Sequence, residues 1–213
     1  MSGEYVIHGA KGTGSVAIEA TLTLLGLPYR VVETTLFDNG GTESAALRQV
    51  NPMMQVPAVI LPGGELMTES AAILIWLADS HPEARLSPSP AASTRPAFLR
   101  WMAFVASAIY ALYWIRDDTR RIIDDPDVGK EARRRIAARL LNCWRAMDAQ
   151  VTPEGYILGD DVTVLDLYVT VVSRWRPGRD RFAEAAPKLA AVVHRVDADP
   201  RLNALWTQRF PFE

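Results

Sequence analysis

A glycine loop near the N-terminus is the first segment whose residues could do chemistry. Residues 12–17, Gly-Thr-Gly-Ser-Val-Ala, follow an apolar strand and open a helix. They fit the G-x-G-x-x-G/A pattern of dinucleotide sites, and Glu33 lies at about the distance expected for a ribose-binding acid. A Walker A phosphate loop is excluded, because no Lys-Ser/Thr pair follows Gly14.

Two other interpretations of this loop stay open. The glycines could serve only to reverse the chain, or the N-terminus of the helix could bind an anion or a thiol. Free N–H groups at a helix N-terminus carry positive potential and stabilise a thiolate. Thr13 and Ser15 add hydroxyl donors at the same end. A bound thiol could therefore be activated there without a metal.

A second motif is the Gln55-Val56-Pro57 segment, which precedes an apolar run. A proline at the entry to a strand is expected at a sheet edge or in a cis turn. A cis Val56–Pro57 bond would leave the Val56 N–H and C=O free to pair with an extended peptide, as in strand addition. The alternative is a trans proline that simply begins an edge strand.

A third motif is the Glu69-Ser70 pair at the start of a predicted helix. These side chains could bind the amine and the carboxylate of an α-amino acid head group. The alternative is a simple N-cap accompanied by an acid in the first turn.

The elements that must position these motifs divide the chain into two halves. Residues 1–86 predict the order β-α-β-α-β-β-α, in which the first two strands are parallel and the last two form a hairpin. The hairpin disfavours the dinucleotide interpretation, which needs further βα units. Residues 87–93 have the composition of a linker, and residues 94–213 predict a helical bundle. The predicted elements are strands at 5–8, 29–36, 58–61 and 65–67, and helices at 15–25, 42–50, 68–78, 94–117, 130–150, 163–175, 187–196 and 202–206.

These motifs together resemble the glutathione S-transferase family, and the resemblance covers essentially the whole chain. It implies a fold of α/β plus all-α type, with an N-terminal thioredoxin-like domain followed by a C-terminal helical bundle. It also implies that glutathione, as co-substrate, binds in extended form. Gln55, Val56 and Pro57 would hold its cysteinyl unit, and Glu69 and Ser70 its γ-glutamyl group.

The resemblance also assigns the chemistry. The thiol would point at the N-terminus of the first helix and attack a small electrophile. The positions at which relatives usually carry a catalytic Ser, Tyr or Cys correspond to Gly12 or Gly14 here. Thiol activation is therefore assigned first to Thr13 and second to Ser15, with help from backbone N–H groups.

The helical half holds the other candidate residues. Tyr110 and Trp114 share a helix face at i, i+4 and are expected to form walls of an electrophile pocket. Thr163 and Asp166 resemble the family's capping box and are expected to be structural. The charges of residues 174–179 either satisfy carbonyls at a helix end or contact an anionic substrate.

Composition excludes several classes of function. The net charge of -2 argues against a nucleic-acid partner, and no apolar run approaches the ~18 residues of a membrane span. The N-terminus lacks the pattern of a secretory signal. One cysteine, Cys143, and three scattered histidines exclude a disulfide framework and predict no metal site.

We therefore expect a cytoplasmic, homodimeric glutathione transferase that uses no metal. The alternatives are a glutathione-dependent isomerase or dehalogenase on the same fold, or a transferase-like binding protein without catalysis.

Overall fold

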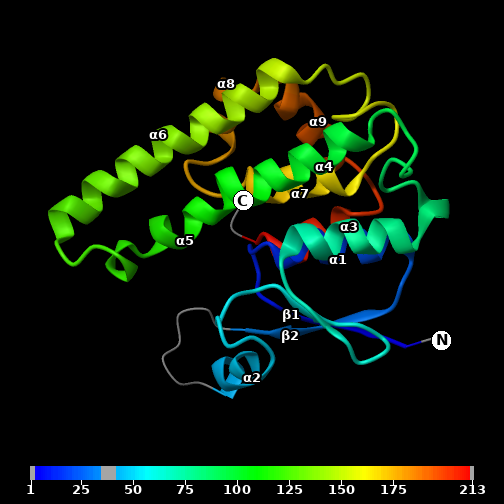
Figure 1. Cartoon of the computed structure of the whole chain (residues 1–213), viewed down its shortest axis with the longest axis horizontal. Coiled ribbons are helices and arrows are strands. Elements are labelled where there is room, and N and C mark those ends of the chain that lie inside the picture. Colours follow the sequence, from blue (N-terminus) through cyan, green and yellow to red (C-terminus); the bar gives the residue numbers. More distant parts are fainter. Residues whose placement is uncertain (1–2, 35–41, 212–213) are drawn as a thin grey trace.

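A four-stranded mixed sheet forms the base of the N-terminal half of this computed structural model, which describes residues 3–34 and 42–211 (Figure 1). The strands have the spatial order β2-β1-β3-β4. Their bounds are β1 Tyr5–Gly9, β2 Tyr29–Glu33, β3 Ala58–Ile60 and β4 Leu66–Met67. β1 and β2 are parallel, and β3 and β4 form an antiparallel hairpin, as predicted. β3 also pairs antiparallel with β1.

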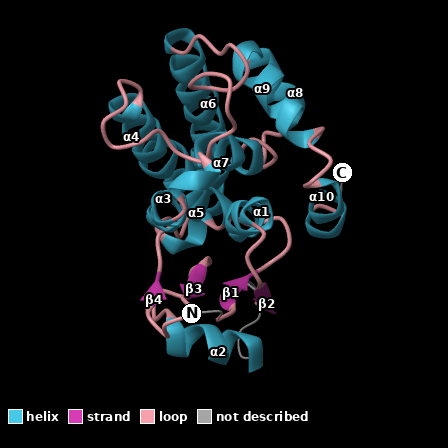
Figure 2. Cartoon of the chain, turned by 90° about the vertical axis from the view of Figure 1, so that its right-hand side faces the viewer, coloured by secondary structure: helices cyan, strands magenta, loops and turns pink. Residues whose placement is uncertain are grey.

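Helices cover both faces of this sheet. α1 (Ser15–Leu25) and α3 (Ser70–Ser80) lie on one face, and α2 (Thr42–Val50) lies on the other (Figure 2). α1 ends where predicted, because Gly26 adopts the left-handed conformation with φ 64° and its N–H bonds carbonyls of the last turn. β2 ends at Glu33, before the predicted limit of residue 36. Thr35 and Leu36 lie outside the described residues.

The rest of the described chain, from Arg95 onward, is helices, loops and one isolated bridge. The fold is therefore a thioredoxin-like domain followed by a helical domain, as predicted. The boundaries at residues 1–86, 87–93 and 94–213 stay a prediction. The helical segments are α4 Arg95–Phe104, η2 Val105–Tyr110, α5 Ala111–Asp117, η3 Thr119–Arg121, α6 Pro126–Gln150, α7 Val164–Val172, α8 Arg179–Ala185, α9 Pro187–Asp197 and α10 Asn203–Arg209. A short 3-10 turn, η1, spans Pro82–Ala84.

Three details of this helical domain differ from the sequence prediction. The predicted helix at 94–117 is interrupted by η2, which is a π-helical segment. α6 begins four residues earlier than predicted, because Pro126 occupies its first turn and the Asp125 carboxylate accepts the N–H groups of Asp127 and Val128. α8 was missed, since it is only seven residues long and follows the Pro177-Gly178 turn.

The helical stretch at residues 95–117 is long and apolar enough to cross a membrane by length and composition alone, with a mean hydropathy of 1.4. The expectation that no segment reaches that length therefore failed. In the fold, however, α4 and η2 pack against α7, and α5 packs against α6. Phe98, Met102 and Ile109 of this stretch are fully buried in the core. We therefore assign it to the helical bundle.

α7 is the centre of the helical domain, and all nine of its residues are buried. It contacts α1 and α3 of the first domain, so the two halves share one continuous core. The Arg95 side chain, at the start of α4, bonds Asp79 of α3 at 2.6 Å, and the Val164 N–H bonds the Leu86 carbonyl at 2.8 Å. These contacts join the helical domain to the last turn of α3 and to the segment that follows it.

Candidate active site

A cavity of about 790 Å³ lies between the two domains, at the N-termini of α1 and α3. The glycine loop and the segment before β3 form one wall. η2, α5 and the segment after α7 form the other. Of the residues predicted to bind or activate substrate, the cavity is lined by Thr13, Gln55, Val56, Pro57, Glu69, Ser70, Tyr110 and Trp114. Ser15 does not line it.

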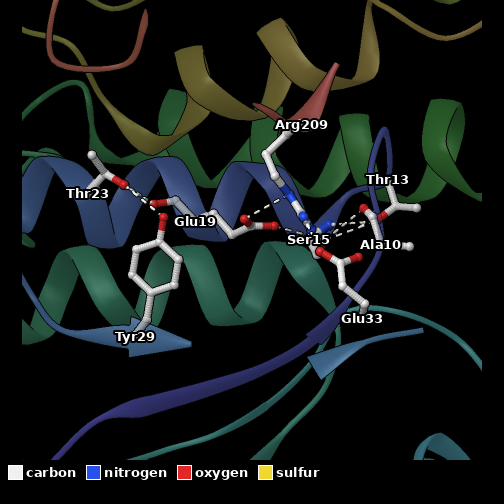
Figure 3. Close-up of polar contacts among 8 residues, drawn as sticks. All are labelled: Ala10, Thr13, Ser15, Glu19, Thr23, Tyr29, Glu33 and Arg209. Carbon is white, nitrogen blue, oxygen red and sulfur yellow. Dashed lines mark hydrogen bonds and ion pairs between the residues drawn. The ribbon is translucent and has the colours of Figure 1, made fainter. Parts of the chain in front are cut away.

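The hydroxyl of Ser15 lies in a buried polar cluster with Glu19 and Arg209 (Figure 3). Ser15 is fully buried and donates to Glu19 Oε1 at 3.3 Å. Glu19 forms an ion pair with Arg209 at 3.0 Å, and Arg209 also pairs with Glu33. Glu33 is thus bound to an arginine of α10, whereas the dinucleotide interpretation assigns it to a ribose. Burial raises the pKa of Glu19 to about 7, although Arg209 opposes this shift.

Thr13 lines the cavity, but its hydroxyl is engaged within the loop. Thr13 Oγ1 donates to the Ala10 carbonyl at 2.8 Å and lies 3.0 Å from Ser15 Oγ. It also accepts the Ser15 N–H at 3.4 Å. The side chain of Thr13 therefore closes the turn that starts α1, in the manner of a local side-chain to backbone hydrogen bond.

The segment before β3 presents the backbone of Val56 to the cavity. The Val56–Pro57 bond is cis, the first of the two geometries considered from the sequence. Asn51 is buried, and its side-chain amide donates to the Gln55 carbonyl at 2.8 Å while its oxygen accepts the Met53 N–H. These hydrogen bonds stabilise the segment at residues 51–55, which precedes Val56.

The Glu69-Ser70 pair stands at the start of α3, as predicted. Glu69 has φ 65° and ψ 99°, a strained conformation for a residue with a side chain, and its carboxylate is exposed at the cavity. Ser70 is buried, and its hydroxyl lies 2.8 Å from the Tyr168 hydroxyl of α7. If Tyr168 donates, the Ser70 O–H stays available to a carboxylate at the N-terminus of the helix.

Aromatic side chains of the helical domain close the cavity opposite the glycine loop. The ring of Trp175 meets Tyr110 and Tyr113 edge to face, at centroid distances of 4.8 and 4.9 Å. The indole N–H of Trp175 donates to the Gly12 carbonyl at 2.7 Å. Sequence analysis singled out the charged neighbours of Trp175 and missed its own role, because an interdomain contact leaves no local pattern.

The arginines around Trp175 have defined partners. Arg179 donates to the Thr170 carbonyl at 2.9 Å, which supports the interpretation that this group satisfies carbonyls at a helix end. Arg174 pairs with Asp197 at 2.6 Å. Arg116, on the cavity wall, lies 3.7 Å from the carboxylate of Asp117. The lining of the cavity therefore contains both arginines and aromatic side chains.

The Thr163–Asp166 pair lies away from the cavity wall that carries the aromatics and forms a capping box at the start of α7. The Asp166 carboxylate accepts the N–H and the hydroxyl of Thr163 and the N–H of Ile157, at 2.7 to 2.9 Å. Burial raises the pKa of Asp166 to about 6, against the effect of these hydrogen bonds. Among the residues that the structure describes, no cluster of His, Cys, Asp or Glu could hold a metal ion.

A thioredoxin-like domain carries this site together with a helical domain that closes it, and comparison with known proteins supplies the family. Residues 15–80 match the model of the glutathione S-transferase N-terminal domain. Residues 15–80 therefore form a glutathione S-transferase N-terminal domain, and the chain as a whole is similar to proteins of that family.

Relatives of this family align with almost the full length of the chain. It is 29% identical to an uncharacterized GST-like protein, YncG, of Escherichia coli K12, over 92% of this chain and 94% of that protein. It is 26% identical to the glutathione S-transferase GstA of Escherichia coli O157:H7, over 90% and 92%. A mouse maleylacetoacetate isomerase is 27% identical over 70% of this chain and 67% of its own length.

Solved structures show the same fold. A glutathione transferase homologue from Sulfitobacter, solved with bound glutathione, superimposes with a TM-score of 0.83 at 21% identity, over 98% of this chain and 99% of that one.

Proposed function

We propose that this protein is a glutathione transferase that conjugates the thiolate of glutathione to a small hydrophobic electrophile. The observation that carries the proposal is the meeting of three groups in one cavity: the Val56 backbone, the Glu69-Ser70 pair and the N-terminus of α1. These groups match the three parts of an extended γ-glutamyl peptide with a thiol at its centre. The family and its glutathione-bound structural neighbour support the same ligand.

Glutathione would bind along this wall in extended form. The N–H and C=O of its cysteinyl unit would pair with the Val56 backbone, as a strand pairs with a sheet edge. Its γ-glutamyl amine would meet the Glu69 carboxylate, and its α-carboxylate would meet Ser70 and the first N–H groups of α3. Gln55 and Pro57 flank Val56 and shape the same subsite.

The thiol would then lie near Gly14, at the start of α1. The positive potential there favours the thiolate, which attacks a carbon of the electrophile. A sulfur–carbon bond forms, the leaving group departs with the electron pair of its bond, and the thiol proton passes to solvent. Tyr110 and Trp114 offer the apolar surface on which the electrophile would rest.

A glutathione-dependent isomerase is the second candidate. The isomerase relative favours it, since its name describes a reaction on an anionic substrate and the lining of this cavity contains Arg116 and Arg176. A glutathione-dependent dehalogenase and a binding protein without catalysis remain as alternatives. Two assays separate these activities. A transferase converts a chloronitroaromatic compound with release of chloride, whereas an isomerase converts a cis-enone diacid without net loss of glutathione.

Glutathione affinity tests the site itself. Immobilised glutathione should retain the protein, and Glu69→Ala or Ser70→Ala should weaken retention because each removes a contact to the γ-glutamyl group. Glu65→Ala is the matched control, since it removes an exposed carboxylate from the adjacent hairpin outside the cavity. Equal retention of all four proteins would refute the assignment. The proposal also includes a cytoplasmic location and a homodimer. Sedimentation of the purified protein measures the oligomeric state directly.

A further inference from the structure

The hydroxyl of Tyr110 occupies the corner where the glycine loop and the Val56 segment meet. It lies directly against the backbone of Gly14, where a Cβ atom would overlap it. It lies 3.4 Å from the Val56 carbonyl oxygen, the long limit for a hydrogen bond. A methyl group added at Gly14 would lie 2.7 Å from Cε2 of the Tyr110 ring, so only glycine permits this approach. Tyr110 thus touches both backbone groups between which the thiol would lie.

The other donors of the glycine loop are already bound within the protein. The N–H groups of Gly12, Thr13 and Val16 donate to backbone carbonyls. The Ser15 N–H and the Thr13 hydroxyl are engaged inside the turn. Gly14 lines the cavity, and Tyr110 lies against its backbone.

The position of Tyr110 is fixed by its packing. Its ring lies against Trp175 at 4.8 Å and against Tyr168 at 6.0 Å. Tyr110 is also the last residue of the π-helical segment η2, and a π-helical turn changes the direction of the side chains that follow it. The hydroxyl is therefore held at the loop before any ligand binds.

We propose that Tyr110 is a catalytic residue that donates a hydrogen bond to the sulfur of bound glutathione. This inference rests on the proposed function and places the thiol activator on the helical domain, outside the glycine loop. On binding, the cysteinyl N–H pairs with the Val56 carbonyl, which frees the Tyr110 O–H to turn from its long bond toward the sulfur. The Gly14 N–H and the Tyr110 O–H then stabilise the thiolate together.

Tyr110 acts as a hydrogen-bond donor and keeps its proton throughout. Burial raises the pKa of its phenol well above the ordinary value, so the group stays neutral when a glutathione thiol ionises. The proton of the thiol passes to solvent, and the electron pair on sulfur forms the bond to the electrophile. A neutral donor to a charged sulfur lowers the pKa of the thiol, which increases the thiolate fraction at neutral pH.

The pKa of the bound thiol tests this inference directly. Thiolate absorbance of the wild-type protein saturated with glutathione should titrate about one pH unit below that of Tyr110→Phe. At pH 7 the kcat of Tyr110→Phe should fall roughly tenfold with little change in the KM for glutathione, and the deficit should shrink above about pH 9, where the free thiol ionises unaided. Tyr29→Phe is the control, because its hydroxyl bonds Thr23 outside the cavity.

The outcomes separate this inference from the proposed function. A wild-type protein that does not bind glutathione would overturn both. Normal glutathione binding with the same thiol pKa in wild type and Tyr110→Phe would overturn the role of Tyr110 alone. Should Tyr110→Phe lose stability, Gly14→Ala gives a second test: it displaces the same hydroxyl, so its thiol pKa should also rise, whereas Gly63→Ala, in open space on the β3–β4 turn, should leave it unchanged.

Discussion

The indole nitrogen of Trp175 lies 2.7 Å from the carbonyl oxygen of Gly12, although 163 residues separate them. The contact joins the segment after α7 to the loop at which the thiol of glutathione is proposed to ionise. Because Trp175 also packs on Tyr110, one side chain fixes both sides of the proposed sulfur site. The helical domain therefore positions the glycine loop and does not merely cover it.

Trp175→Phe should damage catalysis more than binding. The substitution removes the hydrogen bond to Gly12 but keeps an aromatic ring, so we expect a loss of about 1 kcal/mol in unfolding free energy. We also expect a kcat that is roughly three- to tenfold lower, because the loop and Tyr110 lose their fixed spacing. Steady-state kinetics and urea unfolding measure these effects.

Trp206→Phe is the control for this prediction. Its indole nitrogen is buried without a hydrogen-bond partner, and it does not line the cavity. A kcat reduced equally in both variants would show that loss of a buried indole, and not loss of the hydrogen bond to Gly12, lowers the rate.

Tyr168→Phe should weaken binding of the γ-glutamyl group of glutathione. Its hydroxyl is the partner of Ser70, and without it the buried Ser70 oxygen loses a hydrogen bond at 2.8 Å. The Ser70 hydroxyl would then turn toward other acceptors, so the KM for glutathione should rise roughly threefold or more, with kcat at saturation nearly unchanged. An unaltered KM would show that Ser70 is oriented by the helix alone.

The positions of the two motifs that line the cavity from the thioredoxin-like domain could be predicted, because their determinants are local. Val56-Pro57 is a feature of two adjacent residues, and Glu69-Ser70 follows from the start of an amphipathic helix. The parallel pairing of β1 with β2 and the β3–β4 hairpin were predictable for the same reason, since short connections leave few topologies. The approach of Tyr110 to Gly14 was not predictable, because it depends on the packing of η2 and Trp175, which no spacing rule encodes.

The Ser15 assignment illustrates the same limit. The sequence places a hydroxyl at the start of α1, but its direction depends on Glu19 and on Arg209 from the far end of the chain. Nothing near Ser15 in the sequence indicates an arginine 194 positions later. The structure turns the hydroxyl of Ser15 into that cluster and leaves Thr13 at the cavity.

Stability should fall as pH rises from about 4.5 to about 7, through the titration of Glu19. Burial raises its pKa to about 7, so in this window the folded protein keeps a proton that the unfolded chain has released. The contribution of Glu19 to the unfolding free energy is fully present below the ordinary pKa of the carboxyl and is lost once the pH exceeds about 7. It amounts to about 3 kcal/mol at most.

Urea unfolding from pH 4.5 to 8 measures this effect. In Glu19→Gln the unfolding free energy should depend less on pH, because the neutral glutamine amide does not titrate. Glu33→Gln, which removes the half-exposed partner of the same Arg209, should keep most of the slope, because burial is the main cause of the raised pKa of Glu19 and the charge of Glu33 adds only a small part. Parallel profiles for the wild type and Glu19→Gln would contradict the assignment.

Asp166→Ala should destabilise the whole fold. It leaves the buried N–H groups of Ile157 and Thr163 without their acceptor, at a cost of about 3 kcal/mol. Asp160→Ala, which removes an exposed carboxylate from the same loop, should change the midpoint of urea unfolding little. A small effect for both variants would show that the capping box is dispensable for α7.

The structure of the protein in complex with glutathione tests the central claim most directly. We expect the cysteinyl backbone paired with Val56, the γ-glutamyl group at Glu69 and Ser70, and the sulfur within about 3.5 Å of both Tyr110 Oη and the Gly14 nitrogen. Glutathione bound with its sulfur directed at another part of the cavity, or a cavity that stays empty at saturating glutathione, would contradict the account.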